Sequence, residues 1–282
     1  MTETFPLTER PNTGWDARIR VFDTAGEVDA YVITTERHLV LVDTTSTPEQ
    51  ALKIMLAVQE DLSGRSLLVI NTHQHSDHTW GNAIFTSTGP YPAPIIAHEV
   101  SAQLLSGGEP ETYLKSQQEK NPRFAQVKII PPTVTFTGEM KIHGGDLTLH
   151  LIHTPGHLKD HLAVWIPEIQ TLLTGDAAEH PIPYTADPAE LPVLIDSLER
   201  MHSLNAQVVF ACHGGTSSPD LLARNLKYYQ LLKEKTAGLT EKEQVQWSFD
   251  QAMQDLGLAG EEFPKFYRHF HDLNIISMLQ QK

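Results

Sequence analysis

The stretch at residues 71–78, Asn-Thr-His-Gln-His-Ser-Asp-His, constrains this chain more than any other. It places three imidazoles and one carboxylate within six residues, directly after residues 67–70, an apolar run that predicts a strand. Loops at strand ends are where a rigid scaffold holds catalytic groups. Because imidazole and carboxylate are the ligands that zinc and similar ions prefer, the pattern predicts a metal site. A solvated, histidine-rich loop is the alternative.

Composition narrows the class of protein. A chain of 282 residues with 40% hydrophobic content can bury a sizeable core as one large domain with an appendage. The formal charge of −14 repels phosphate backbones and anionic lipid, which disfavours nucleic acid and membranes as partners and favours a small-molecule substrate. Residues 1–20 lack the apolar segment of a signal peptide, and the single cysteine, Cys212, cannot form an internal disulfide. We therefore expect a cytoplasmic protein.

Short apolar and alternating runs predict two similar β-rich halves. Residues 18–23, 30–35 and 38–43 predict consecutive antiparallel strands, and Pro48 opens a helix to about Asp61 with Met55 and Leu56 on one face. In the second half, strands precede helices at residues 188–201 and 219–233, and further helices are expected at 240–254 and 264–279. This order predicts two sheets packed together with helices outside. The expected divisions are a leader at 1–17, a catalytic domain at 18–235 and a helical extension at 236–282.

Candidate metal ligands follow four predicted strands, which are far apart in the chain. They are His73, His75, Asp77, His78, His157, Asp176 and His213. These residues divide into two sites. The first, with an open fourth position that lowers the pKa of bound water toward about 7, is formed by His73, His75 and His157. The second is formed by Asp77, His78 and His213, with the Asp176 carboxylate bridging both.

Four motifs carry a resemblance to a known family. They are His-Gln-His-Ser-Asp-His at 73–78, His-Thr-Pro-Gly-His at 153–157, Thr-Gly-Asp at 174–176 and Cys-His-Gly-Gly at 212–215. In this order they resemble the motifs of the metallo-β-lactamase superfamily of hydrolases, over roughly residues 20–235. The resemblance implies an α+β fold, the four-layer αββα sandwich, with the site at one edge between the sheets. It also implies a dinuclear centre with two zinc ions per chain, iron or manganese being the alternatives.

The resemblance leaves the substrate open, because members of the superfamily hydrolyse lactams, lactones, thioesters, phosphoesters and nucleic acids, and some iron-containing members are oxidases. His75 stands where flavodiiron-type relatives carry glutamate, which argues against that branch. Residues 177–181 lack the Gly-Cys-Gly-Arg type of sequence found in hydroxyacylglutathione hydrolases. Acyl-homoserine lactonases usually carry a tyrosine where this chain has Glu179, and Tyr184 is the candidate substitute.

The leading hypothesis is a metal-dependent hydrolase in which a hydroxide bridging the two ions attacks an ester, lactone, thioester or related carbonyl bond. Asp176 would bridge the ions, and Asp77 is a candidate for returning the proton to the leaving group. One alternative is a phosphodiesterase or ribonuclease, in which Lys159 would approach the substrate. The others are a mononuclear iron oxygenase and a scaffold that retains metals for folding.

Several other side chains are candidates for the substrate pocket or its support. The pocket candidates are Trp80, His180 and Tyr184. His161 is expected to bond to its own loop, and Cys212 is expected to be a small buried hydrophobe rather than a ligand. Aromatic residues recur at helical spacing in residues 263–270, which predicts core, a homodimer interface or a specificity element at the site mouth.

Overall fold

The computed structural model of the chain describes residues 5–281, which form two compact units. The first unit extends to His153 and includes Leu162–Ile169. The second consists of Thr154–His161 and the chain from Gln170 onward. The strands are ordered β1-β2-β3-β4-β5-β6-β7 in a seven-stranded sheet and β12-β11-β10-β9-β8 in a five-stranded sheet.

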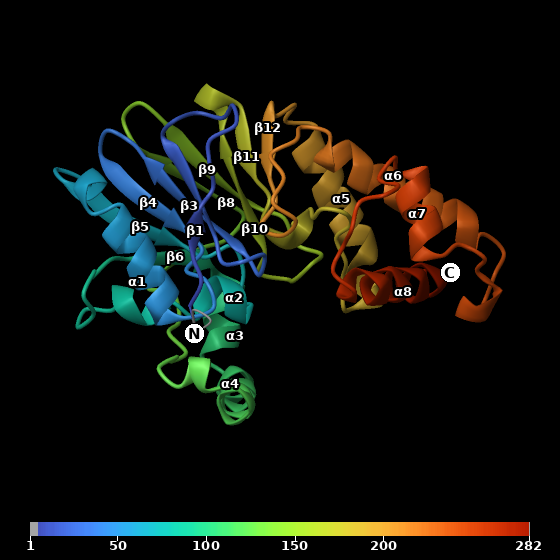
Figure 1. The fold of residues 1–282 in the computed structure, drawn as a ribbon, viewed down its shortest axis with the longest axis horizontal. Helices are drawn as coiled ribbons and strands as arrows, with labels where there is room; N and C mark the ends of the chain where they lie inside the picture. The colour runs from blue at the N-terminus through green and yellow to red at the C-terminus, as the bar shows by residue number, and fades with distance from the viewer. Residues whose placement is uncertain (1–4, 282) are drawn as a thin grey trace. The chain divides into compact units, whose positions relative to one another are not determined.

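The seven-stranded sheet lies in the first unit and combines an antiparallel part with a parallel part (Figure 1). Its strands are β1 (Thr8–Glu9), β2 (Ile19–Asp23), β3 (Asp29–Thr34), β4 (His38–Val42), β5 (Ser66–Ile70), β6 (Ile95–His98) and β7 (Val134–Phe136). Strands β1 to β4 pair antiparallel, as the sequence predicts for β2 to β4, whereas β4 to β7 pair parallel. The carboxyl ends of β4, β5 and β6 therefore share one edge, and the histidine loop follows β5 there.

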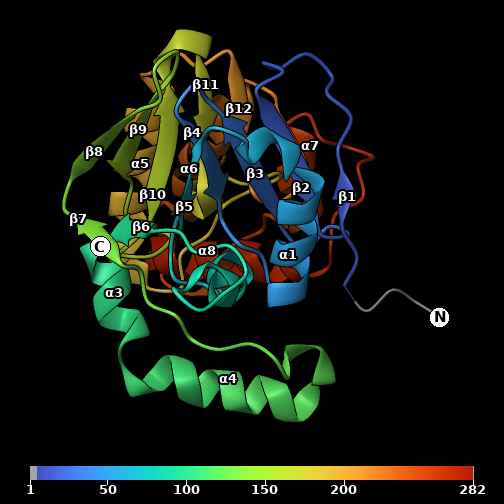
Figure 2. The same cartoon turned by 90° about the vertical axis from the view of Figure 1, so that its left-hand side faces the viewer.

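Helix α1 (Pro48–Ala57) covers one face of this sheet. The Thr47 side chain caps it by accepting from the Gln50 N–H, and Ile54 and Met55 pack among the core residues of β3 to β5. Leu56 is 56% exposed, so the predicted apolar face was wrong at that position. The other helices of this unit are α2 (Ser76–Thr79), α3 (Glu99–Leu105) and α4 (Gly108–Lys120), and Figure 2 shows α3 leaving β6 with α4 running below it.

The strands of the second sheet differ in direction. In the first unit, β8 (Glu139–His143), β9 (Thr148–His153) and β10 (Leu162–Ile166) pair antiparallel. In the second unit, β11 (Thr171–Leu173) and β12 (Val208–Phe210) pair parallel. The first residue of β10 also contacts the loop that leaves β5, because the Leu162 N–H donates to the Thr72 carbonyl at 2.8 Å. This bond ties the start of the histidine loop to the second sheet.

Helices dominate the rest of the second unit: α5 (Leu191–His202), α6 (Leu221–Thr236), α7 (Phe249–Asp255) and α8 (Phe266–Leu279). Helix α6 packs against both α5 and α8 (Figure 1). The predicted helix at 240–254 was too long, because Ser248 and Gln251 form a capping box that starts α7 only at Phe249. Among residues 5–281, no helix has the length and apolar character that a membrane crossing requires.

Candidate metal centre

The histidine loop of the first unit is fixed by a carboxylate from the neighbouring strand end. The Asp43 carboxylate accepts from the Thr72 N–H and the Thr72 hydroxyl, both at 2.8 Å. Since that hydroxyl donates to Asp43, it accepts from His73 Nδ1 at 3.0 Å, and the lone pair of this imidazole is then on Nε2. The His73 ring centroid lies 4.8 Å from that of His75 and 4.1 Å from that of His78.

Asp43 also orients the last histidine of the loop. Its Oδ2 lies 2.8 Å from His78 Nδ1, and both side chains are completely buried. A carboxylate can only accept here, so Nδ1 carries the proton and Nε2 presents a lone pair, 3.7 Å from Asp77 Oδ2. Asp43 has a φ of 62°, a left-handed conformation that aspartate tolerates better than most residues. Asp43 was not among the predicted site residues, although its place at the end of the strand predicted at residues 38–43 was an available signal.

The loops of the second unit bring one carboxylate oxygen beside two imidazoles. Asp176 Oδ2 lies 3.6 Å from His157 Nε2 and 3.2 Å from His213 Nε2. His157 Nδ1 donates to the Tyr184 carbonyl at 3.0 Å, which leaves the Nε2 lone pair on the side of Asp176. One oxygen of Asp176 is therefore close to an imidazole nitrogen of each of these two histidines.

Glycine is required at two positions next to these histidines, because another segment of backbone lies too close to leave room for a Cβ atom. Gly156 has a φ of 127°, and a Cβ there would lie 2.3 Å from the Leu194 Cα of helix α5. Gly214 has a φ of 87°, and a Cβ there would lie 2.3 Å from the His180 carbonyl oxygen. Any side chain at either position would move the loop that carries the adjacent histidine.

His161 holds the Asp176 loop from behind. Its Nε2 accepts from the backbone N–H groups of Asp176 and Ala177 at 3.0 and 3.2 Å. Its Nδ1 consequently carries the proton and donates to the Thr154 hydroxyl at 2.9 Å. The expectation that His161 bonds to its own loop is confirmed, and the structure adds that it also positions Asp176.

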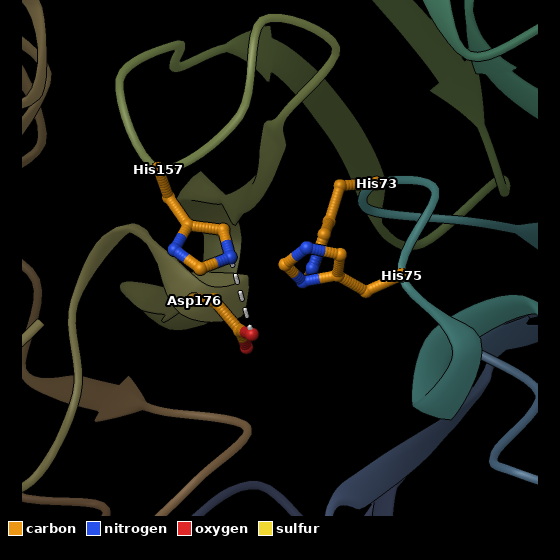
Figure 3. Close-up of side chains that lie close together, drawn as sticks. All are labelled: His73, His75, His157 and Asp176. Carbon is orange, nitrogen blue, oxygen red and sulfur yellow. Dashed lines mark ion pairs between the residues drawn. The ribbon is translucent and has the colours of Figure 1, made fainter. Parts of the chain in front are cut away.

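The ligand atoms of the predicted residues form compact groups. His73, His75, His157 and Asp176 each offer one ligand atom, and these atoms all lie within 4.8 Å of one another. Figure 3 shows the four side chains pointing toward one another. Asp77, His78 and His213 form a second group by the same measure. All seven predicted ligands therefore belong to groups that could hold metal ions, and Asp176 is grouped with His73, His75 and His157.

A third group consists of Asp43, His78 and Cys212, whose ligand atoms also lie within 4.8 Å of one another. Cys212 is buried, as expected of a small hydrophobe. Its sulfur lies within 4.8 Å of the ligand atoms of Asp43 and His78.

The three pocket candidates have different surroundings. Trp80 is 4% exposed and packs with Leu114 of α4 and Val127. His180 Nε2 lies 3.0 Å from Glu261, and burial lowers the pKa of His180 although Glu261 opposes this shift. Tyr184 lies beside His157, with ring centroids 5.3 Å apart. Their roles toward a substrate stay predictions.

The metallo-beta-lactamase superfamily model matches residues 23–213, and the chain belongs to this superfamily. A solved structure from Thermus thermophilus, the metallo-beta-lactamase family protein TTHA1429, has a TM-score of 0.63 at 19% identity, with 98% of this chain and 93% of that chain covered. These findings confirm the predicted metallo-β-lactamase fold and the C-terminal helices.

Curated relatives include proteins named for hydrolysis. The lactamase-like protein aptB of Emericella nidulans is 25% identical over 76% of this chain and 60% of its own length. A hydroxyacylglutathione hydrolase of Rhodospirillum rubrum is 28% identical over 59% of this chain and 55% of its own. The acyl-coenzyme A thioesterase MBLAC2 of Homo sapiens is 25% identical over 56% of this chain and 60% of its own. The chain thus spans less than two thirds of the length of each of these relatives.

Proposed function

We propose that this protein is a dinuclear metal-dependent hydrolase that cleaves an ester, lactone or thioester bond of a small molecule. The observation that carries the proposal is the shared carboxylate oxygen of Asp176, which lies 3.6 Å from His157 Nε2 and 3.2 Å from His213 Nε2. These two imidazoles belong to different groups of candidate ligands, so Asp176 is suited to contact both ions.

The protonation of the imidazoles supports a metal at each group. Nδ1 of His73, His78 and His157 faces an acceptor in each case, namely the Thr72 hydroxyl, the Asp43 carboxylate and the Tyr184 carbonyl. The lone pair of each imidazole is therefore on Nε2, and the Nε2 atoms of His78 and His157 lie near carboxylate oxygens. Lone pairs and carboxylates repel one another unless a cation lies between them, and a set of nitrogen and oxygen donors suits zinc.

In this proposal, His73, His75 and His157 would hold one ion, Asp77, His78 and His213 would hold the other, and Asp176 would be a ligand to both. Such ions would supply a nucleophilic water near neutral pH and would polarise the bond to be cleaved. The side chains of the protein would orient the substrate and transfer protons. Asp77 has a side chain that is 29% exposed, so it can exchange a proton with solvent and pass it to the leaving group.

The thioester class receives support from two relatives, because one is named as a hydroxyacylglutathione hydrolase and another as an acyl-coenzyme A thioesterase. Residues 177–181 lack the sequence expected for glutathione substrates, which favours another acyl thioester or ester. The charge of −14 continues to disfavour nucleic acid as the substrate.

The test combines metal analysis with a substrate screen. Protein purified without added ions is analysed for zinc, iron and manganese, then assayed on thioesters, lactones, aryl esters, β-lactams and phosphodiesters. We expect two metal ions per chain and turnover of an acyl substrate. Cleavage of phosphodiesters alone would favour a phosphodiesterase or ribonuclease instead. One iron per chain with oxygen uptake would favour a mononuclear iron oxygenase.

Replacement of the shared carboxylate tests the site itself. Asp176→Asn keeps the size of the side chain but removes its charge, and we expect it to abolish turnover and lower the metal content together. The matched control is His143→Gln, which changes an exposed histidine on β8 and should leave both unchanged. An Asp176→Asn protein with two metals and full turnover would exclude the assigned role.

A further inference from the structure

A row of aromatic rings in the second unit begins at His157 and ends at the surface. The Tyr184 ring packs edge to face against the His157 imidazole, with ring centroids 5.3 Å apart. It also stacks on the Phe270 ring of α8, with ring centroids 3.7 Å apart. Phe270 in turn contacts Phe266, one helical turn earlier, at 5.2 Å. Tyr184 and Phe270 are half-buried, whereas Phe266 is 46% exposed. Apolar surface thus continues from a candidate metal ligand outward to solvent.

Hydrogen bonds fix the backbone on both sides of the Tyr184 ring. The Pro183 carbonyl accepts from the Tyr229 hydroxyl and from the buried Asn274 amide, both at 2.9 Å. The Tyr184 carbonyl accepts from His157 Nδ1 at 3.0 Å. Because the backbone on both sides is fixed, the rings are preorganised, and binding an apolar group against them requires little additional ordering.

Core packing explains the neighbouring Tyr267 but not the end of the row. Tyr267 is almost completely buried, and its hydroxyl donates to Glu179 at 2.9 Å. Phe266 and Phe270 carry no polar group, and Phe266 places nearly half of a phenyl side chain in water. Single exposed hydrophobic residues are common, but here the exposed ring continues a row that starts at His157.

The geometry points to this row, Tyr184, Phe270 and Phe266, as the surface that binds the acyl portion of the substrate and selects uncharged aryl or alkyl groups longer than acetyl. The inference rests on the proposed hydrolase function and names the substrate class within it. The row begins beside His157, whose Nε2 lies on the side of Asp176, so an acyl group lying along the rings would have its carbonyl at the end where the candidate ligands lie. A chain with charge −14 is also poorly suited to an anionic acyl group.

The experiment uses the full chain with zinc added and a series of N-acetylcysteamine thioesters carrying acetyl, hexanoyl or phenylacetyl groups, with thiol release as the readout. For the unaltered protein we expect kcat/KM to rise along the series, by up to about fourfold for each methylene group that the row buries. In Phe266→Ala and in the volume-conserving Phe270→Leu, the value for the phenylacetyl substrate should fall about tenfold. The fall should be smaller for the acetyl substrate, because its acyl group presents a single methyl group to the row.

The control variant is Leu56→Ala, which truncates another exposed hydrophobic side chain, on α1, and should retain the full preference. Binding of 4-phenylbutyrate, measured by calorimetry, provides a readout that does not require turnover. It should weaken about tenfold in Phe266→Ala. Thermal melts identify any variant that has lost its fold, in which case the other row variant decides.

The outcomes separate the two proposals. If the unaltered protein hydrolyses none of these thioesters, the screen of other substrates tests the hydrolase proposal. The calorimetry then tests whether the row binds the acyl group. An unchanged preference for longer acyl groups in both row variants, or unchanged 4-phenylbutyrate binding, overturns the inference. So does a Phe266→Ala protein that changes only its sedimentation, since the exposed ring would then serve contact between copies of the chain.

Discussion

Asp43 lies outside the set of candidate ligands but orients one of them, His78. Its carboxylate receives the Thr72 N–H, the Thr72 hydroxyl and His78 Nδ1, and it is completely buried. The charged Asp43 oxygen lies 2.8 Å from His78 Nδ1, whereas the neutral Thr72 hydroxyl lies 3.4 Å from the same nitrogen. The orientation of the imidazole therefore depends mainly on this carboxylate.

We predict that Asp43→Asn weakens binding of the ion held by His78 by about 10- to 100-fold, because the neutral amide orients the imidazole less well. Asparagine tolerates the left-handed backbone at this position, so the fold should be retained. Titration against a chelating dye measures the affinity of each ion. Equal affinities in the variant and the unaltered protein would show that His78 does not need this partner.

His98 is a residue whose charge matters to stability rather than to the site. It caps α3 by accepting from the Val100 N–H and stacks on His153, with ring centroids 3.9 Å apart. Burial, helped by the neighbouring His153, lowers the pKa of His98 from 6.5 to about 4.

The sign of the resulting pH dependence follows from the direction of that shift. Between pH 6.5 and about 4 the unfolded chain binds a proton that the folded chain does not, so stability falls as the pH decreases through this range. His98→Asn keeps a capping side chain, and we predict a smaller fall in melting temperature between pH 7.5 and 5. His143→Gln, at an exposed position, is the control and should follow the unaltered protein. An identical fall in all three proteins would contradict the prediction.

At the scale of elements, helix α8 connects the C-terminal segment to the candidate site. Asn274 donates to the Pro183 carbonyl, Tyr267 donates to Glu179, and Phe270 stacks on Tyr184. The residues contacted lie in the chain segment that follows Asp176. Helix α8 therefore supports that segment.

Asn274→Ala tests this support. The side chain is completely buried, and removing its amide takes one of two donors from the Pro183 carbonyl, so we predict a loss of about 1–3 kcal/mol in the free energy of unfolding. Urea denaturation measures the loss. Gln280→Ala, at an exposed position just after α8, should change the value by less than about 0.5 kcal/mol. If both variants are equally stable, the bond to Pro183 contributes nothing measurable.

At the scale of the whole molecule, the candidate centre links metal binding to folding. The ligand groups hold buried imidazoles and carboxylates whose arrangement suits bound cations. A metal that binds only the folded chain stabilises it by about 2.7 kcal/mol at 100 times its dissociation constant. We predict that removal of metal by a chelator lowers the melting temperature by roughly 5–10 °C. Scanning calorimetry with and without added zinc measures the shift, and a melting temperature indifferent to chelation would exclude a tightly bound metal.

Sequence patterns sufficed for the fold and for the ligand groups because the relevant information is local. Histidines and aspartates placed directly after apolar runs are visible in any reading of the chain, and strand ends in a parallel sheet share one edge. Helices were less well defined where polar residues dominate, as in the late start of α7 at Phe249, which depends on the side-chain cap at Ser248.

By itself, then, the sequence determined which side chains could meet a metal, in what order, and on which kind of sandwich. Only the tertiary structure decided which ordinary residues hold them: Asp43 for His78, His161 for the Asp176 backbone, and Asn274 for the Pro183 carbonyl. These partners are separated by 35, 15 and 91 positions. A position at a strand end can mark such a residue as a candidate, but it does not reveal which distant residue will be its partner, because the contact exists only after the strands and helices have packed.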